Sequence, residues 1–203
     1  MKIDILVIGG SAGGMLTATT AKKIHKDKSV LIVRKTDKVM VPCGIPYIFG
    51  TLNDSKKNRV PDEPFLNMGI KIMNDEVVSI NKDLKTVLLI SGTVVEYEKL
   101  VIATGSLPIE GSFIKGYKLR NVYPILKDEY YLQFMHDSLK QVEDVVVIGG
   151  GFIGVEFAEQ LAIAGKNVTL VEAATKILAT AFDDEVCDLS EKLMKENGID
   201  IKT

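Results

Sequence analysis

The chain has 203 residues, a formal net charge of -2, 46% hydrophobic residues and 26% charged residues. These values describe a globular protein of one or two domains, and they give no reason to expect nucleic acid or an anionic membrane as a partner. The first ten residues, MKIDILVIGG, carry an acid at Asp4 and then glycines, so they lack the long apolar stretch of a signal peptide or a membrane span. We therefore expect a cytoplasmic protein, and we expect no metal site.

The N-terminal region predicts a strand, a turn, a helix and a second strand. Residues 3–10 are a continuous apolar run, which is typical of a buried parallel strand. Residues 11–26 have helical spacing of their apolar side chains and end in basic residues. Residues 29–35 then read SVLIVRK and predict the next strand.

The turn between the first strand and the helix, GGSAGG at residues 9–14, approximates the GxGxxG pattern, with Ser11 at the middle glycine position. Such a turn lets the backbone approach a pyrophosphate, which the N-terminus of the helix stabilises. The acid expected at the end of the second strand is missing, because Arg34 stands where a carboxylate would bind a ribose hydroxyl. A tight turn without a ligand therefore stays open as the alternative.

One of the two cysteines, Cys43, lies in the stretch VMVPCGIPYIFG between Pro42 and Gly44. If a helix begins at Gly44 and runs toward Phe49, free N–H groups and the helix dipole favour the thiolate of Cys43, which makes it a nucleophile. The alternative is a small buried side chain beside a turn. The other cysteine, Cys187, is too far away in sequence for a local dithiol pair, and we expect it to be a partly buried helix residue without redox function.

Residues 76–106 predict an antiparallel meander, because short strands are separated by the turn signals NKD and SGT. A second strand-turn-helix unit follows over residues 142–172, with Gly149, Gly151 and Gly154 in full GxGxxG spacing and a strand that ends in Glu172. A carboxylate there can accept hydrogen bonds from both ribose hydroxyls and would repel a 2′-phosphate, so we expect NADH to be preferred over NADPH. The alternative is a tight βα turn without a ligand.

The first glycine turn, the cysteine in CGIPY, the strand end VIATG and the second glycine turn together resemble the pyridine nucleotide-disulfide oxidoreductases. More narrowly, they resemble the single-cysteine branch with coenzyme A-disulfide reductases, NADH oxidases and NADH peroxidases. The resemblance implies an α/β fold of two Rossmann-like units, binding FAD and NAD(P)H, with the meander between them and the second unit incomplete. It implies an FAD-binding domain at residues 1–112, without its C-terminal return segment, and a partial NAD(P)-binding domain at residues 113–203.

The same resemblance implies roles for particular residues. Cys43 becomes the catalytic residue, reduced by the flavin on the side opposite the nicotinamide. Phe152 takes the place of an aromatic gate between flavin and nicotinamide, or else packs in the core; Glu156 is a carboxylate near the flavin, or else an ordinary polar helix residue. The expected cofactor-binding residues are Gly9, Gly10, Ser11, Ala12, Gly13, Gly14, Arg34, Lys35, Pro42, Ala103, Thr104, Gly105, Gly149, Gly151, Phe152, Ile153, Gly154, Glu156 and Glu172.

Within the branch, peroxidases and water-forming oxidases look to a histidine in the first glycine turn, and Ala12 stands there in this chain. This favours reduction of a disulfide or persulfide, with coenzyme A as a candidate substrate or mixed disulfide. Lysines near the end of the first helix could meet the phosphates of coenzyme A, or form a solvated surface; they are Lys22, Lys23, Lys26, Lys28, Lys35 and Lys38.

Three functions stay open at this point. The first is an FAD-dependent NAD(P)H oxidoreductase that reduces a small-molecule disulfide or persulfide through Cys43. The second is an NADH oxidase that reduces oxygen at the flavin, and the third is a nucleotide-binding fragment without turnover. We expect the chain to be the N-terminal portion of a longer reductase or a truncated product, and full-length relatives to be homodimers.

Overall fold

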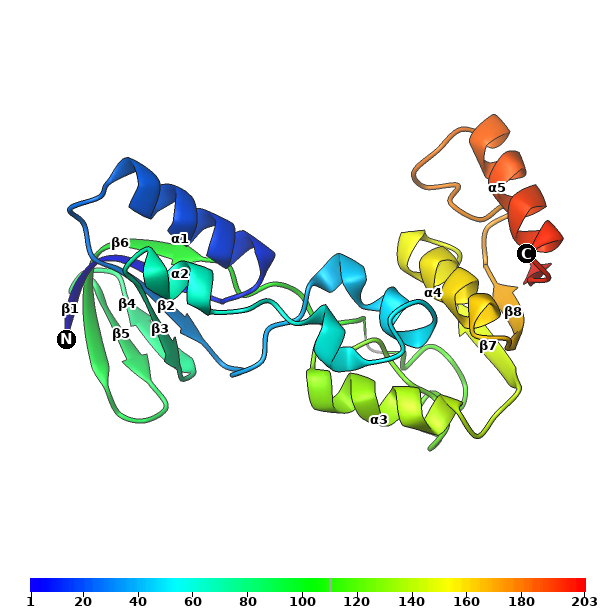
Figure 1. Ribbon diagram of the computed structural model, residues 1–203, viewed down its shortest axis with the longest axis horizontal. Coiled ribbons are helices and arrows are strands. Elements are labelled where there is room, and N and C mark those ends of the chain that lie inside the picture. Colours follow the sequence, from blue (N-terminus) through cyan, green and yellow to red (C-terminus); the bar gives the residue numbers. More distant parts are fainter. Residues whose placement is uncertain (110) are drawn as a thin grey trace. The chain divides into compact units, whose positions relative to one another are not determined.

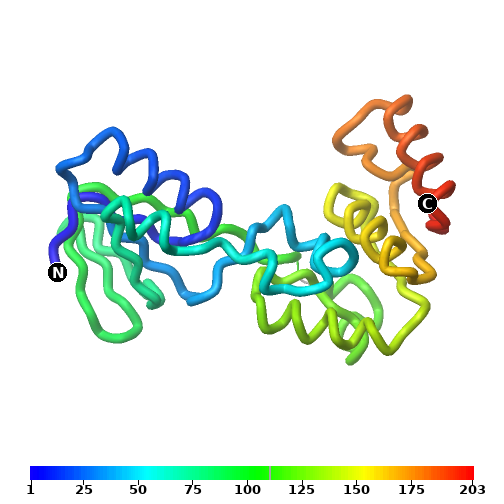
Figure 2. The backbone as a smooth tube through the Cα atoms, in the orientation of Figure 1, coloured from blue at the N-terminus to red at the C-terminus, as the bar shows by residue number. Residues whose placement is uncertain are grey.

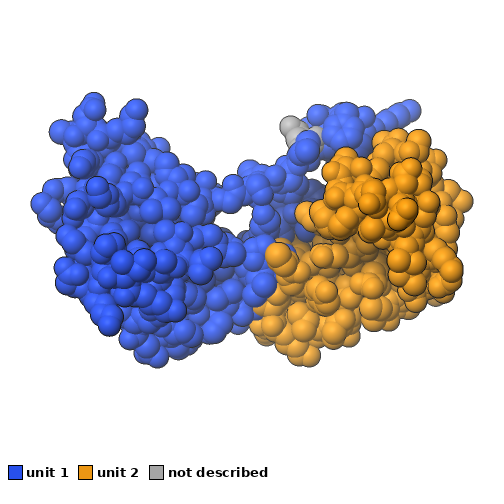
Figure 3. Space-filling view, turned by 90° about the horizontal axis from the view of Figure 1, so that it is seen from above, with its two compact units in different colours: residues 1–42, 59–128 blue, residues 43–58, 129–203 orange. Residues whose placement is uncertain are grey.

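The computed structural model describes residues 1–109 and 111–203, which form two compact units. Unit 1 comprises Met1–Pro42 and Arg59–Asp128, and unit 2 comprises Cys43–Asn58 and Glu129–Thr203 (Figure 3). The segment with Cys43 thus belongs to the same compact unit as the second glycine turn. The two compact units do not test the predicted FAD-binding domain (residues 1–112) and NAD(P)-binding domain (residues 113–203), because those bounds are defined by cofactor binding. Both domains stay a prediction.

Unit 1 is built on a six-stranded mixed sheet with the strand order β3-β2-β1-β6-β5-β4 (Figure 1). β1 pairs in parallel with β2 and with β6, whereas β4, β5 and β6 pair antiparallel. The predicted meander is confirmed, and its last strand continues without a break into the parallel part of the sheet. The strands are β1 (Lys2–Ile8), β2 (Val30–Arg34), β3 (Ile70–Asn74), β4 (Val77–Asn81), β5 (Thr86–Leu89) and β6 (Val94–Ile102), and the helices are α1 (Ala12–Ile24) and α2 (Glu63–Asn67).

The apolar runs of β1 and β2 are continuous because both faces of these strands are covered. On one face, Val7 and Ile32 pack with Met15 of α1. On the other face, Leu6 and Leu31 belong to a cluster completed by side chains of the meander: Val87, Leu89, Val95 and Tyr97. The helix, the parallel strands and the meander therefore form three layers.

Unit 2 contains a three-stranded parallel sheet with the order β7-β8-β9. Gly165, at φ +79°, follows the end of α4, because glycine adopts this backbone region without strain. The side chain of Asp183 accepts a hydrogen bond from Val186 N at 3.3 Å and caps α5. The elements are α3 (Glu129–Leu139), β7 (Asp144–Ile148), α4 (Phe152–Ile163), β8 (Asn167–Val171), α5 (Asp184–Glu196) and β9 (Asp200–Lys202).

The cysteine segment, which we define as residues 43–58, does not contain the predicted helix from Gly44 to Phe49. Short 3-10 helices replace it, namely η1 (Pro42–Gly44), η2 (Pro46–Phe49) and η3 (Ser55–Asn58). Pro46 does not cause this, since it lies in the first turn, where its missing N–H has no partner to lose, and Ile45 before it has αR dihedrals (φ -59°, ψ -46°). The prediction was wrong because the backbone leaves the helical region at Gly50 (φ -133°, ψ -77°), so only short helical turns form. The segment lies beside α3 and α4 (Figure 2). Within the described ranges, no helix combines the length and the apolar character needed to cross a membrane.

Candidate functional site

The first glycine turn lies between β1 and α1 and requires glycine at specific points. Gly9 has φ +109°, and a Cβ on it would collide with the carbonyl of Ala103. Gly14 approaches the carbonyl of Gly9 so closely that a side chain has no room, whereas Gly13 faces open space. This packing brings the start of α1 against the end of β1, where its free N–H groups can bind a pyrophosphate.

The start of α1 and the end of β6 flank this turn. Ser11 is the N-cap residue of α1, its side chain makes no capping hydrogen bond, and Ala12 is exposed. Ala103 N donates to Ile8 O at 2.8 Å, which sets the Ala103-Thr104-Gly105 stretch beside the glycine turn. The structure therefore brings two of the predicted motifs, the first glycine turn and the Ala103-Thr104-Gly105 stretch, together at the carboxyl ends of β1 and β6.

Arg34 is committed to contacts inside unit 1. Its side chain is 3% exposed, and its guanidinium makes a bidentate pair with Asp62, with Nη1 to Oδ1 at 2.7 Å and Nη2 to Oδ2 at 2.6 Å. Nε donates to Asn74 Oδ1 at 3.0 Å, and Nη2 also donates to Asp37 O at 3.0 Å. The aliphatic part of Arg34 lies against Gly10, since a Cβ there would be 2.6 Å from Arg34 Cδ. These contacts give Arg34 a structural role that sequence reasoning did not find.

The second glycine turn repeats the geometry of the first and adds an acid. Gly149 has φ +106°, and Gly154 again leaves no room for a side chain against the preceding carbonyl. Glu172 accepts hydrogen bonds from Ala174 N at 2.7 Å and from Gly150 N at 2.5 Å. These two backbone bonds hold the pKa of Glu172 below its usual value despite partial burial, so the carboxylate is charged at neutral pH beside the turn.

The loop after Glu172 returns to the second glycine turn, which the sequence did not predict. Leu178 N donates to Gly150 O at 2.8 Å, and the buried Ile177 packs against that glycine. Leu178 has φ +59°, a region that non-glycine residues seldom occupy. The loop thereby forms one wall of the turn.

Phe152, at the start of α4, is 56% exposed, so it is not a core residue of unit 2. Its ring meets Phe182 edge to face, with centroids 5.6 Å apart and an interplanar angle of 78°. The next residue, Ile153, is also exposed, and Glu156, one turn further along α4, is half-buried. The side of α4 nearest the glycine turn therefore presents apolar surface to solvent.

The two cysteines differ in their surroundings. Cys43 is exposed in η1, directly after Pro42, whereas Cys187 is fully buried in α5. Burial raises the pKa of the Cys187 thiol, which keeps it protonated at neutral pH. Cys43 is therefore accessible to a small molecule from solvent, whereas Cys187 is not.

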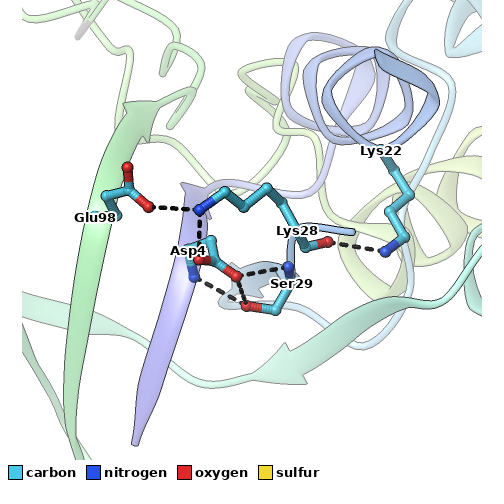
Figure 4. A network of polar contacts seen from close by, with 5 residues as sticks. All are labelled: Asp4, Lys22, Lys28, Ser29 and Glu98. Carbon is cyan, nitrogen blue, oxygen red and sulfur yellow. Dashed lines mark hydrogen bonds and ion pairs between the residues drawn. The ribbon is translucent and has the colours of Figure 1, made fainter. Parts of the chain in front are cut away.

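Two of the lysines at and after the end of α1, Lys22 and Lys28, make contacts within unit 1 (Figure 4). Lys22 Nζ donates to the carbonyls of Lys26 and Lys28 at 2.9 and 2.8 Å. Lys28 Nζ in turn lies 3.1 Å from Asp4 and 3.0 Å from Glu98. These contacts lie at the opposite end of α1 from the glycine turn and favour a structural role over phosphate binding.

Two further lysines near the end of β2 have carboxylate neighbours. Lys35 Nζ lies 3.2 Å from Glu76, and Lys38 Nζ lies 3.3 Å from Asp37. Both pairs are largely solvent-exposed, so they contribute little to stability and can exchange for another anion. The predicted contact of Lys35 with a cofactor stays a prediction.

Two strand-turn-helix units with glycine turns of this geometry define a Rossmann-type protein with two dinucleotide-binding folds. The model of the pyridine nucleotide-disulphide oxidoreductase family matches residues 3–203, and the chain belongs to this family.

Individual relatives give narrower comparisons. NAD(P)H coenzyme A polysulfide/persulfide reductase of Pyrococcus horikoshii is 35% identical over 206 residues, covering 97% of the chain and 45% of that protein. An NADH oxidase of Enterococcus faecalis is 30% identical over 208 residues, covering 98% of the chain and 46% of that protein. The structure of an NAD-dependent persulfide reductase from A. fulgidus matches with a TM-score of 0.84 and 28% identity, covering 99% of the chain and 39% of that protein. The chain thus spans less than half the length of each of these proteins.

Proposed function

We propose that the chain is the FAD- and NAD(P)H-binding portion of an oxidoreductase that reduces a small-molecule disulfide or persulfide through Cys43. The observation that carries the proposal is an exposed thiol in a proline-flanked turn, in a chain with two glycine turns. The names of the relatives, a coenzyme A polysulfide/persulfide reductase and a persulfide reductase, support this class of acceptor. A cytoplasmic location, where thiols stay reduced, suits such chemistry.

The two turns offer cradles that fit the two cofactors. At the first turn, the close approach of Gly14 to Gly9 leaves backbone N–H groups of α1 for the pyrophosphate of FAD. At the second turn, Gly149 and Gly154 do the same for NAD(P)H, and Glu172 accepts from the ribose hydroxyls. A flavin held at the first turn would supply two electrons for sulfur reduction, with NAD(P)H as the hydride source.

The chemistry of the chain itself centres on the thiolate of Cys43. The thiolate attacks one sulfur of the disulfide, forms a mixed disulfide and releases the other half as a thiolate, which takes up a proton. Two electrons and a further proton then reduce the mixed disulfide, restoring the Cys43 thiolate and releasing the second thiol. NADH is the source of the two electrons, so one NADH is consumed for each disulfide reduced.

Reduction of oxygen at the flavin is the second candidate function, because one relative is named an NADH oxidase. Ala12 disfavours it, since no acid-base side chain is present at that point of the first turn. The two functions differ in their need for a thiol.

The test compares Cys43→Ser with Cys187→Ala, a matched loss of the buried thiol, in protein purified with FAD. We expect Cys43→Ser to abolish NADH-dependent reduction of coenzyme A disulfide, and Cys187→Ala to retain it. If Cys43→Ser shows a flavin spectrum and still reduces coenzyme A disulfide, the proposed role of the cysteine is rejected. Rapid consumption of oxygen in that variant would establish the oxidase instead, and a colourless folded protein would reject flavin binding by the chain.

A further inference from the structure

The cysteine segment docks onto α4, the helix that begins at the second glycine turn. The ring of Phe49 lies between two aromatic side chains, 5.1 Å from Phe157 of α4 and 6.0 Å from His136 of α3, measured between centroids. Ile48 and Phe49 are both buried. An apolar contact thus holds the part of the segment that directly follows the turn with Cys43.

A buried polar contact continues this docking at the next residues. Gln160 of α4 is 2% exposed, and its Oε1 accepts hydrogen bonds from Thr51 N at 3.0 Å and from Thr51 Oγ1 at 2.8 Å. The surrounding positions of α4 are mainly apolar, and a glutamine costs free energy there unless its polar atoms are used. The side-chain oxygen of Gln160 accepts both of these hydrogen bonds from Thr51 of the cysteine segment.

Gly50 allows the segment to reach the helix. A Cβ on Gly50 would collide with the backbone carbonyl of Gln160 and lie 2.8 Å from its Oε1. A side chain at position 50 therefore has no room while the segment keeps this close approach to α4. Gly50 and Gln160 are therefore two sides of one contact.

A second glutamine holds the far end of the segment. Gln133 of α3 accepts from Ser55 N at 3.3 Å and from Ser55 Oγ at 2.8 Å. Asn58 is buried and packs against Gly44, next to the cysteine. The segment is thus fixed on α4 and α3 at points on both sides of its middle, and Cys43 extends from its fixed part.

We propose that Gln160 is a positioning residue for Cys43, and that α4 supports both the second glycine turn and the cysteine segment. Phe152 and Gln160 lie on the same helix, two turns apart. Rigid attachment of the segment to this helix fixes the backbone from which the thiol projects. The proposal rests on the proposed function for the importance of Cys43, although its structural content is independent of turnover.

The decisive variants are Gln160→Met, which keeps the volume of the side chain and removes the acceptor, and Gly50→Ala, which disrupts the same contact from the other side. Gln141→Met is the matched control, because Gln141 is exposed at the end of α3. All three are made in the full chain.

Two measurements are compared in these proteins. Hydrogen exchange at the amide of Thr51 should accelerate about tenfold in Gln160→Met and Gly50→Ala, as expected for the loss of one buried hydrogen bond, with α5 amides unchanged. A trifluoromethyl label on Cys43 should give one fluorine NMR signal in the parent and in Gln141→Met, and a shifted or split signal in the two decisive variants. Binding of NADH should change less than twofold.

Two outcomes would overturn the proposal. In one, the Thr51 amide exchanges faster in Gln160→Met and Gly50→Ala, but the fluorine signal of the label on Cys43 does not change. This result would mean that docking of the segment does not position the thiol. In the other, all amides of unit 2 accelerate together, so that Gln160 only stabilises the unit. Failure of the proposed function is a separate result, in which Cys43→Ser turns over at the parent rate while the exchange and fluorine effects are present.

Discussion

Removing the carboxylate of Asp62 should strongly destabilise unit 1, because it leaves the charge of Arg34 buried. The guanidinium makes four hydrogen bonds, two of them to Asp62 at 2.6 and 2.7 Å, while its side chain is only 3% exposed. Breaking a buried ion pair from one side costs about 3–5 kcal/mol. Since the Asp62 side chain is 33% exposed, water can partly replace it, and we expect about 3 kcal/mol for Asp62→Ala.

Native-state hydrogen exchange at β2 amides measures this change in unit 1 alone. A loss of about 3 kcal/mol corresponds to exchange that is about 150-fold faster in the globally exchanging amides. Replacing both partners by apolar residues, in Arg34→Met with Asp62→Leu, should recover most of the loss. The control is Glu76→Ala, which breaks an exposed pair and should cost less than about 1 kcal/mol. If Asp62→Ala exchanged no faster than this control, Arg34 would not depend on Asp62, and our account of Arg34 would be refuted.

Three other changes test the second glycine turn and the polar contacts of Asp4. Glu172→Ala should weaken NADH binding about 10- to 100-fold and reduce the preference over NADPH, as measured by titration of nicotinamide fluorescence; an unchanged preference would show that Glu172 does not face the ribose. The pKa of Asp4 lies well below its ordinary 3.8, chiefly through hydrogen bonds from Ser29, so this group stabilises the fold above about pH 4 and loses that contribution as the pH falls. Acid unfolding of the parent should therefore be steeper below pH 4 than that of Asp4→Asn. Gly154→Ala should cost about 2–3 kcal/mol and abolish dinucleotide binding, whereas Gly151→Ala, which faces open space, should fold normally in urea titrations.

Local sequence signals were sufficient for most of the fold. Apolar runs predicted the parallel strands because both faces are covered, and turn signals predicted the meander. The position of Glu172 beside its turn could also be predicted, since the strand end fixes it. The partners of Arg34 could not, because Asp62 and Asn74 lie 28 and 40 residues away and a single sequence does not show which distant side chains meet. The helix at Gly44 was predicted wrongly because the backbone leaves the helical region at Gly50, where the segment meets the distant residue Gln160 of α4.

The two glycine turns have the same backbone geometry, but the side chains beside them differ in the hydrogen-bond acceptors available to a ribose. A carboxylate has about four sites for hydrogen bonds, and Gly150 and Ala174 use two of those on Glu172, which leaves about two acceptors already in place for a ribose diol. The side chain of Arg34 has only donors, and most of these are bound to Asp62, Asn74 and the Asp37 carbonyl. Residue 34 therefore cannot accept a hydrogen bond from a ribose hydroxyl. In the proposed function, Glu172 would therefore accept from a ribose in unit 2, whereas the first turn would hold FAD through backbone contacts with its pyrophosphate.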